Sequence, residues 1–332
     1  MTDTQTLLKI KDLTVEYKTD DNLIQALSSV DLEIKKGMTL GLVGETGAGK
    51  TTIAKSIMRL IPSPPGQIIS GEIVYDGVDL LKLPQQEMQR VRGAQISMIF
   101  QDPMTALDPV MTVGKQIAEV VEIHEKCNSA QAMAKAREML EMVGIPAKRA
   151  DEYPHQFSGG MKQRVVIAIA LACNPNLLIA DEPTTALDVT IQAQVLDLMR
   201  HLREDLGTSL LLITHDLGVV AQTCACVAII YAGEIVEYGT VDQIFYDHKH
   251  PYTAGLFGSI PILNKEEDRL QPIEGIMPDP ADLPSGCKFH PRCKYATEQC
   301  ENINPPLADI GDGHLTRCQQ GKLMMKGDAS SW

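Results

Sequence analysis

The chain has 332 residues, 44% of them apolar and 22% charged, which predicts a globular protein of about two domains. Its net charge of −13 argues against broad nucleic-acid binding, because Lys and Arg on phosphates supply most of that affinity. No apolar run reaches the ~18 residues of a membrane span and the first residues are polar without a signal peptide, so we expect a cytosolic chain that contacts a membrane only through a partner.

Strands are expected within residues 7–43, and the last is the apolar run 38–43. An eight-residue sequence follows that fits the phosphate-binding loop G-x-x-x-x-G-K-T/S: Gly44, Glu45, Thr46, Gly47, Ala48, Gly49, Lys50 and Thr51. Apolar residues at helical spacing follow it, so the loop lies between a strand and a helix start. Its glycines allow backbone N–H groups to surround phosphate oxygens, Lys50 is predicted to reach the β- and γ-phosphates, and Thr51 to ligate Mg²⁺. The alternative is an ordinary glycine-rich turn before a helix, which the adjoining strand, helix and Lys-Thr pair disfavour.

The next elements predict an α/β fold with an inserted helical region. Residues 67–80 are predicted to form a hairpin with turns at Gly71 and at Asp76-Gly77, and 96–100 a short strand. From 112 to 171 the periodicity is helical, with Ser129 as a candidate cap. Strands and helices alternate again from 177 to 213, which predicts a mainly parallel sheet split by a helical insertion at about 100–165.

Two carboxylates follow the apolar strand 177–180. Ligands of open α/β sheets bind at the carboxyl ends of the strands, which is where Asp181 and Glu182 lie in the sequence. Asp181 is predicted to hold Mg²⁺ and Glu182 to act as general base toward the attacking water. An acidic pair after a strand is often only a solvated turn, and the phosphate loop earlier in the chain favours the catalytic interpretation.

The sequence 157–161, Phe-Ser-Gly-Gly-Met, resembles the signature of the ATP-binding-cassette ATPases, typically L-S-G-G-Q. Ser158, Gly159 and Gly160 precede an apolar helix, so helix-terminal N–H groups provide an anion site. In that family the site binds the γ-phosphate held by the opposite subunit of a dimer. Phe157 and Met161 depart from the common signature and lie beside the serine and glycines.

Further positions match the family residue by residue. The resemblance implies that Gln101 senses Mg²⁺ and faces a membrane subunit, that Asp188 belongs to the D-loop at the dimer seam, and that His215 contacts the γ-phosphate. Tyr17 resembles the aromatic residue that stacks on adenine, and Thr52 completes the nucleotide-binding set. The family fold is a P-loop NTPase core, a mixed sheet with flanking helices, which carries an α-helical subdomain and an antiparallel β subdomain.

Four cysteines fall within a Pro-rich tail: Cys287, Cys293, Cys300 and Cys318. Clustered cysteines in a cytosolic chain favour metal ligation, but structural zinc sites and ferredoxins usually have tighter spacings. Spacing alone therefore predicts a metal without naming it, and His290 and His314 are possible substitute ligands in a zinc site. The alternative is four cysteines without a ligand role.

A narrower resemblance connects the chain with importer ATPases for dipeptides, oligopeptides and nickel. It is carried by residues 99–109, by His-Pro-Tyr-Thr at 250–253 with Ile-Pro at 260–261, and by Gly-Cys-Lys-Phe-His-Pro-Arg-Cys at 286–293. Residues 79–99 resemble the D-type subunit more than its F-type partner. Relatives can hold a 4Fe-4S cluster in this tail, which favours iron–sulfur over zinc.

The resemblance implies an ATP-hydrolysing subunit with a nucleotide-binding domain at 1–250 and a C-terminal extension with a four-cysteine metal module at 251–332. Its implied partners are an F-type ATPase subunit, two permeases and an extracytoplasmic peptide-binding protein, with no nucleic acid, at the cytoplasmic face of the membrane. A nickel importer of the same family is one alternative. A DNA- or ribosome-associated cassette ATPase is another, and it is disfavoured because those proteins carry long coiled coils or two cassettes.

Overall fold

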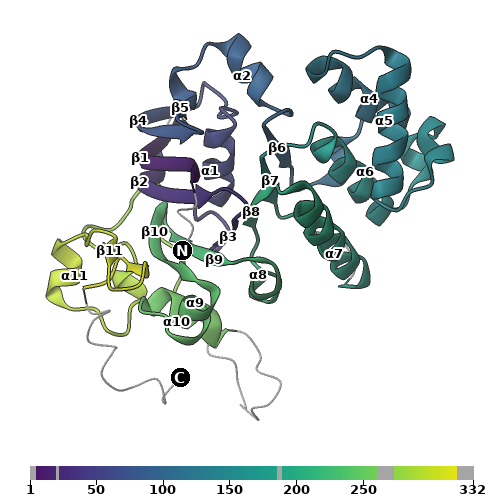
Figure 1. The fold of residues 1–332 in the computed structure, drawn as a ribbon. Helices are drawn as coiled ribbons and strands as arrows, with labels where there is room; N and C mark the ends of the chain where they lie inside the picture. The colour runs from purple at the N-terminus through teal and green to yellow at the C-terminus, as the bar shows by residue number, and fades with distance from the viewer. Residues whose placement is uncertain (1–4, 20–21, 185–188, 260–272, 320–332) are drawn as a thin grey trace. The chain divides into compact units, whose positions relative to one another are not determined.

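The computed structural model describes residues 5–19, 22–184, 189–259 and 273–319 (Figure 1). The chain divides into two compact units. The first comprises Met1–Leu7, Ile34–Thr39 and Tyr75–Thr214, and the second comprises Leu8–Glu33, Leu40–Val74 and His215–Trp332. Each unit is described by itself.

The first unit combines short parallel strands with several helices. Its elements are β5 (Val78–Asp79), η1 (Leu80–Lys82), α2 (Gln85–Val91), β6 (Ile96–Ile99), α3 (Pro103–Ala106), α4 (Val113–His124), α5 (Ser129–Met142), η2 (Ala147–Asp151), η3 (Pro154–Gln156), α6 (Gly159–Leu171), β7 (Leu177–Asp181), α7 (Val189–Leu206) and β8 (Ser209–Ile213). β6, β7 and β8 are parallel neighbours, and every residue of the three strands is buried. Parallel strands covered on both faces require such continuous apolar sequence, as predicted.

Helices α4, α5 and α6 pack together in this unit (teal in Figure 1). The predicted cap of α5 is off by one residue. Asn128, rather than Ser129, is the N-cap: its side chain accepts from Gln131 N–H, and the Gln131 side chain accepts from Asn128 N–H. This reciprocal capping box satisfies two N–H groups that the helix itself leaves unpaired.

The second unit contains the phosphate loop and the C-terminal elements. Its elements are β1 (Thr6–Lys18), β2 (Leu23–Lys35), β3 (Thr39–Val43), α1 (Lys50–Ile57), β4 (Gly66–Tyr75), α8 (Leu217–Thr223), β9 (Cys226–Tyr231), β10 (Glu234–Thr240), α9 (Val241–Tyr246), α10 (Pro251–Gly258), η4 (His290–Arg292), α11 (Glu298–Asn302), β11 (Ala308–Asp309) and β12 (Leu315–Thr316). β1 lies between β2 and β4, while β3 pairs with β9 in parallel, and β9, β10, β12 and β11 follow as antiparallel neighbours.

The predicted turn at Gly71 is wrong, because β4 continues through it. A Cβ atom at Gly71 would lie 2.6 Å from the Cα atom of Leu13 and from the carbonyl oxygen of Asp12. Glycine is therefore required by the close approach of β1, and the chain reverses only at Asp76-Gly77, between β4 and β5.

The described tail, residues 273–319, is called here the C-terminal segment, and it shares its core with β9, β10 and α10. Phe289 is 4% exposed, and its ring lies 5.2 Å from that of Tyr231 and 5.4 Å from that of Tyr252. β12 adds to the edge of β10, where Thr316 pairs with Glu237. The C-terminal segment is therefore held by both sheet hydrogen bonds and apolar packing.

In the part of the chain that the structure describes, no helix has the length and apolar character needed to cross a membrane.

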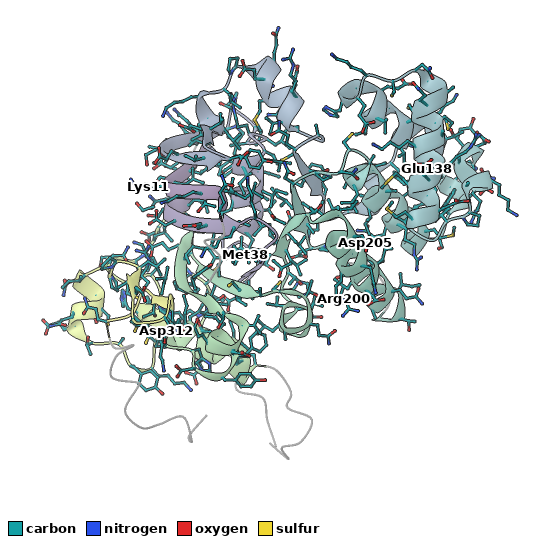
Figure 2. The ribbon with its side chains drawn as sticks, viewed as in Figure 1. Lys11, Met38, Glu138, Arg200, Asp205 and Asp312 are labelled. Atoms are coloured by element: carbon teal, nitrogen blue, oxygen red, sulfur yellow. The ribbon has the colours of Figure 1, made fainter. Side chains whose placement is uncertain are left out.

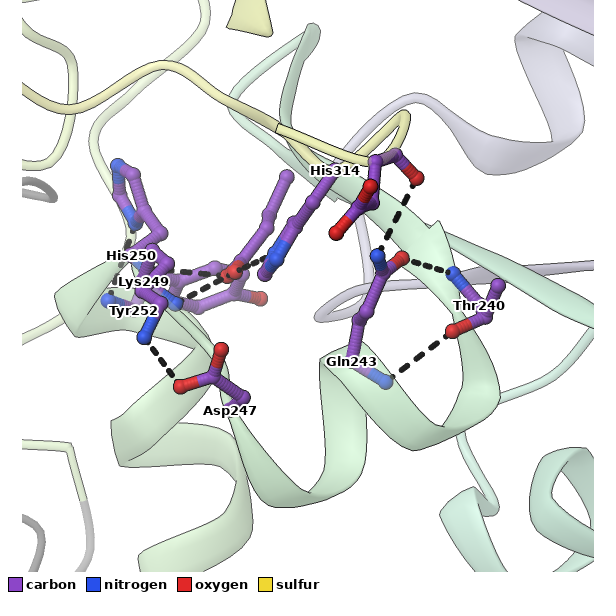
Figure 3. Close-up of polar contacts among 9 residues, drawn as sticks. Thr240, Gln243, Asp247, Lys249, His250, Tyr252 and His314 are labelled. Atoms are coloured by element: carbon purple, nitrogen blue, oxygen red, sulfur yellow. Dashed lines mark hydrogen bonds and ion pairs between the residues drawn. The ribbon is translucent and has the colours of Figure 1, made fainter. Parts of the chain in front are cut away.

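A buried carboxylate joins α10 to the C-terminal segment (Figure 3). Glu237 is fully buried and accepts from the backbone N–H groups of Lys249 and His250, and it pairs with His314 Nε2 at 2.8 Å. His250 in turn caps α10, since its Nδ1 accepts from Tyr252 N–H. This capping role requires an unprotonated Nδ1.

We expect the free energy of unfolding to fall on mild acidification because of His250. Burial lowers the pKa of His250 to about 4, Glu237 opposes that shift and Arg317 adds to it. Between the unfolded pKa of about 6.5 and this value, the unfolded chain binds more protons, so stability decreases as the pH falls through that window, by up to about 1.4 kcal/mol per pH unit. The variant His250→Asn keeps a capping side chain and removes the titration.

Urea unfolding at pH 7 and pH 5 checks this expectation. The parent chain should lose about 2 kcal/mol more than His250→Asn between the two pH values. Equal losses in the two proteins would show that His250 does not carry the acid sensitivity.

Candidate active site

The phosphate loop connects β3 to α1 in the second unit. Gly49 is the N-cap of α1 with φ 108°, a left-handed conformation that favours glycine. At Gly44 a Cβ atom would lie 2.3 Å from the carbonyl oxygen of Ile230, so no other residue fits without moving the backbone. Lys50 is 7% exposed, and its Nζ donates to the carbonyl oxygens of Gly44 and Glu45 at 2.8 and 3.0 Å. The lysine therefore bends back over its own loop.

The loop fits a phosphate group and its magnesium ion. Thr46 and Gly47 are exposed, and Thr51 and Thr52 are partly exposed in the first turn of α1. A helix start with nearby backbone N–H groups favours anions, and a hydroxyl oxygen is a ligand that Mg²⁺ accepts. The donor set predicted from the sequence is thus present and accessible in this unit.

Three further predicted residues lie at the carboxyl ends of β6 and β7 in the first unit. Asp181 ends β7 and is 2% exposed. Glu182 follows with φ 48°, a left-handed conformation that costs backbone energy in a residue other than glycine. Gln101 lies two residues after the end of β6, and its side chain donates from Nε2 to Glu182 Oε2 at 3.0 Å. The fold therefore brings together two residues that are 81 positions apart in the sequence.

The signature residues form the start of α6 in the same unit. Ser158 is the N-cap with extended backbone, and both Ser158 and Gly159 are exposed. A Cβ atom on Gly159 would meet nothing within 4 Å, so the helix start faces open space. Gly160 is tighter, because its Cβ atom would lie 2.5 Å from Ile191 Cγ2.

The two departures from the common signature are explained by one arginine. Phe157 is 5% exposed, and the guanidinium of Arg149 lies 4.4 Å from its ring centroid. The same guanidinium donates to Met161 Sδ at 3.3 Å. Arg149 thus contacts both Phe157 and Met161, while Ser158 and Gly159 between them remain exposed.

Three further residues, His215, Tyr17 and Asp188, were predicted to belong to the nucleotide site. His215 is exposed and directly precedes Asp216, whose Oδ1 caps α8 through Gly218 N–H and Val219 N–H. Tyr17 lies near the end of β1, partly buried, with its ring 2.8 Å from where a Cβ atom of Gly66 would be. Asp188 lies outside the described residues.

The expected metal module at Cys287, Cys293, Cys300 and Cys318 is wrong. The four thiols line one small cavity, yet among residues 5–19, 22–184, 189–259 and 273–319 no group of three or more His, Cys, Asp or Glu side chains is arranged to hold a metal ion. This finding removes both the 4Fe-4S cluster and the zinc alternative, with His290 and His314 as substitutes.

A physical reason is that two of the four thiols pack as apolar groups. Cys287 and Cys293 lie against the core around Phe289 and Tyr231. Burial raises the pKa of Cys287, and it raises that of Cys293 to about 11. Burial therefore disfavours, at both positions, the thiolate form that a metal binds. Clustering in the sequence indicated proximity correctly and ligation wrongly.

Two residues that touch the phosphate loop were not predicted. Tyr252 Oη accepts from Glu45 N–H at 3.0 Å, and Arg292 forms an ion pair with the Glu45 carboxylate. Both lie in sequences that carried the family resemblance, at 250–253 and 286–293. No spacing rule connects either residue with position 45, so only the folded chain reveals these contacts.

Comparison with known proteins agrees with the site. A family model described as "ABC transporter" matches residues 27–185, and one for the C-terminal region of oligopeptide/dipeptide transporters matches residues 236–300. The oligopeptide transport ATP-binding protein OppD of Bacillus subtilis is 53% identical over 314 residues, covering 94% of this chain and 88% of that protein. OppD of Haemophilus influenzae is 47% identical over 314 residues, with 94% and 96% coverage.

A solved structure supports the same conclusion at the level of the fold. The ATP-binding cassette MJ0796, described as dimeric and bound to ADP and phosphate after hydrolysis, is 29% identical with a TM-score of 0.64. The match covers 70% of this chain and 98% of that one. The class defined by the fold and the loop is thus an ATP-hydrolysing cassette that uses ATP with Mg²⁺. The chain belongs to the ATP-binding proteins of the oligopeptide ABC transporter family.

Proposed function

We propose that this chain is the motor subunit of an importer for di- and oligopeptides, which drives transport through partner permeases by ATP-dependent closure of a dimer. The observation that carries the proposal is the similarity to two OppD proteins across 94% of the chain, including the C-terminal region. A likeness limited to the cassette would have supported ATP hydrolysis without a cargo class.

The proposed ATP site combines the phosphate loop with the further nucleotide-site residues predicted from the sequence. Tyr17 stacks on adenine, the loop residues 44–51 with Thr52 surround the phosphates, and His215 contacts the γ-phosphate. Thr51, Gln101 and Asp181 would hold Mg²⁺, which would neutralise part of the phosphate charge. The accessible hydroxyl of Thr51 and the helix start at Gly49 support this assignment.

Glu182 is the proposed general base. Its carboxylate takes the proton of the attacking water while the water oxygen bonds to the γ-phosphorus and the bond to the β-phosphate oxygen breaks. The hydrogen bond from Gln101 Nε2 to Glu182 Oε2 orients the carboxylate. The left-handed backbone at Glu182 supports a functional role, since such strain is retained where position matters.

The signature acts in trans in this proposal. Ser158, Gly159, Gly160 and Met161 contact the γ-phosphate of ATP held by an F-type partner, and Asp188 lies at the seam of that heterodimer. The exposed start of α6 supports the assignment, because open space is available for a phosphate from another chain. The dimeric description of MJ0796 is consistent with it.

The proposed domain organisation is a nucleotide-binding domain at 1–250 and a C-terminal extension at 251–332. Helices α4, α5 and α6 correspond to the helical subdomain of about 100–165, and β1, β2 and β4 to the β subdomain. The further partners are two permeases and an extracytoplasmic peptide-binding protein, without nucleic acid. The subunit would sit at the cytoplasmic face of the membrane.

Reconstituted uptake tests the proposal. The chain is assembled in proteoliposomes with its F-type partner, both permeases and the binding protein, and labelled dipeptides, longer peptides and Ni²⁺ are supplied outside. We expect ATP-dependent uptake of peptides that is abolished by Lys50→Ala. Uptake of Ni²⁺ without any peptide would replace the cargo assignment, and undiminished uptake with Lys50→Ala would refute the motor role.

A further inference from the structure

The C-terminal segment reaches the phosphate loop through an arginine. Arg292 donates from its two terminal nitrogens to the two carboxylate oxygens of Glu45, at 2.8 and 3.1 Å. The Arg292 side chain is 6% exposed and that of Glu45 is 28% exposed. A bidentate pair of this geometry, largely shielded from water, is stronger and more directional than a surface ion pair.

Two more contacts hold the same part of the loop. Tyr252 Oη accepts from the backbone N–H of Glu45 at 3.0 Å, and Tyr252 itself is fully buried. Met277 Cε lies 3.0 Å from where a Cβ atom of Gly47 would be. Residues 45 to 47 are therefore contacted by three side chains from beyond residue 250, all within the second unit.

The groups that make these contacts are rigidly anchored. Arg292 Nε donates to the carbonyl oxygen of Glu274 at 3.1 Å, and Arg292 NH1 donates to Tyr231 Oη at 3.4 Å. Burial lowers the pKa of Arg292, but the hydrogen bonds to Glu45 and Tyr231 together outweigh it and raise the pKa, so the guanidinium stays charged. The buried Glu237 accepts from the backbone N–H of His250 at the start of α10, the helix that carries Tyr252.

The charge of the loop explains why such an anchor matters. Among residues 44–51 the charged side chains are Glu45 and Lys50, so the loop by itself has no net charge. A triphosphate ligand is strongly anionic, and a carboxylate beside it opposes binding by Coulomb repulsion. Arg292 cancels the charge of Glu45 and leaves that of Lys50 to act on the phosphates.

We propose that Arg292 is a positioning residue of the ATP site, which neutralises Glu45 and, with Tyr252, holds the loop in its phosphate-binding conformation. The inference rests on the proposed function of residues 44–51. In this proposal the C-terminal segment, through Arg292, is part of the nucleotide site of this chain.

Nucleotide affinity of the full-length chain tests the inference. Arg292→Met keeps the length of the side chain and removes its charge. We expect Mg-ATP to bind about tenfold more weakly by calorimetry, Mg-ADP to lose less, and adenosine to lose nothing, because the repulsion scales with ligand charge. Glu45→Gln added to Arg292→Met should restore the Mg-ATP affinity to within about threefold, because it removes the unpaired carboxylate.

The matched control is Arg317→Met, which removes a buried arginine from the same segment. Arg317 donates to the carbonyl oxygens of Ile235 and Pro305. The variant Arg317→Met is therefore expected to leave the Mg-ATP affinity unchanged. If Arg292→Met is too unstable to measure, Arg292→Gln still decides. It keeps hydrogen-bond donors but has no charge, so Mg-ATP should again bind about tenfold more weakly while adenosine binds normally.

The outcomes separate the inference from the proposed site. Unchanged Mg-ATP affinity in Arg292→Met, an equal loss for adenosine, or a double variant as weak as the single one would each overturn the inference. A normal Mg-ATP affinity in Arg292→Gln would do so as well. Lys50→Ala reports on the site itself: if that variant binds Mg-ATP like the parent chain, residues 44–51 are not the phosphate site.

Discussion

The variant Glu182→Gln is expected to bind Mg-ATP with nearly normal affinity and to lose hydrolysis by about 10²–10⁴-fold, the usual worth of a general base. The amide has the size of the carboxylate and can still accept the hydrogen bond from Gln101, so the local geometry survives. What disappears is the capacity to take a proton from water. Phosphate release by the assembled heterodimer under single-turnover conditions measures the effect.

The control for this experiment is Glu138→Gln on the surface of α5 (Figure 2). It makes the same chemical change at an exposed position and should leave hydrolysis unaffected. If Glu182→Gln hydrolysed ATP at the rate of that control, another group would have to accept the proton. Lost binding together with lost hydrolysis would instead indicate a damaged site.

Replacement of Ser158 by arginine should lower the rate of ATP hydrolysis at the partner's phosphate loop by roughly 10²-fold or more, a loss typical of removing one oxyanion donor. Ser158 is exposed at the N-cap of α6, and Gly159 beside it faces open space. An arginine there occupies the volume meant for a phosphate, without disturbing the buried Phe157. The effect is expected in the proposed heterodimer, in which this site would receive ATP from the other subunit.

Dimers that combine variants of this chain with an unmodified partner show at which of the two ATP sites hydrolysis is lost. Lys50→Ala in this chain silences its own loop, so the remaining hydrolysis reports the partner's loop, and that activity should vanish when Ser158→Arg is added. Ser129→Arg, which places the same side chain at another exposed helix start, is the matched control. A loss confined to the site formed by Lys50 of this chain would contradict binding in trans.

Local sequence was sufficient to predict the loop between β3 and α1 and the strand that ends at Asp181. The loop residues are contiguous, their glycines are demanded by backbone conformation at Gly49 and by the close approach at Gly44, and the flanking strand and helix have clear periodicity. The run of buried residues in β7 similarly places Asp181 and Glu182 at a strand end. Such features depend on interactions within a few residues, so a pattern can report them.

Sequence patterns were less reliable where the local conformation depends on a distant strand or on one side-chain hydrogen bond. Gly71 was predicted to be a turn, yet β1 approaches it so closely that glycine is required within a continuous strand. Asn128 and Ser129 are both good caps, and the choice was made by the reciprocal hydrogen bond with Gln131. The family resemblance specified the signature, and the structure added why Phe157 and Met161 are accommodated there by Arg149.

The sequence by itself determined the class of protein, the phosphate loop and the order of the cassette motifs, because each is written in adjacent residues. Only the tertiary structure decided whether the four clustered cysteines ligate a metal. Ligation requires convergent thiolates, whereas Cys287 and Cys293 pack against the core around Phe289, where burial disfavours the thiolate. Only the tertiary structure joined Arg292 to Glu45, 247 positions away, because chain distance carries no information about which side chains a shared core brings into contact.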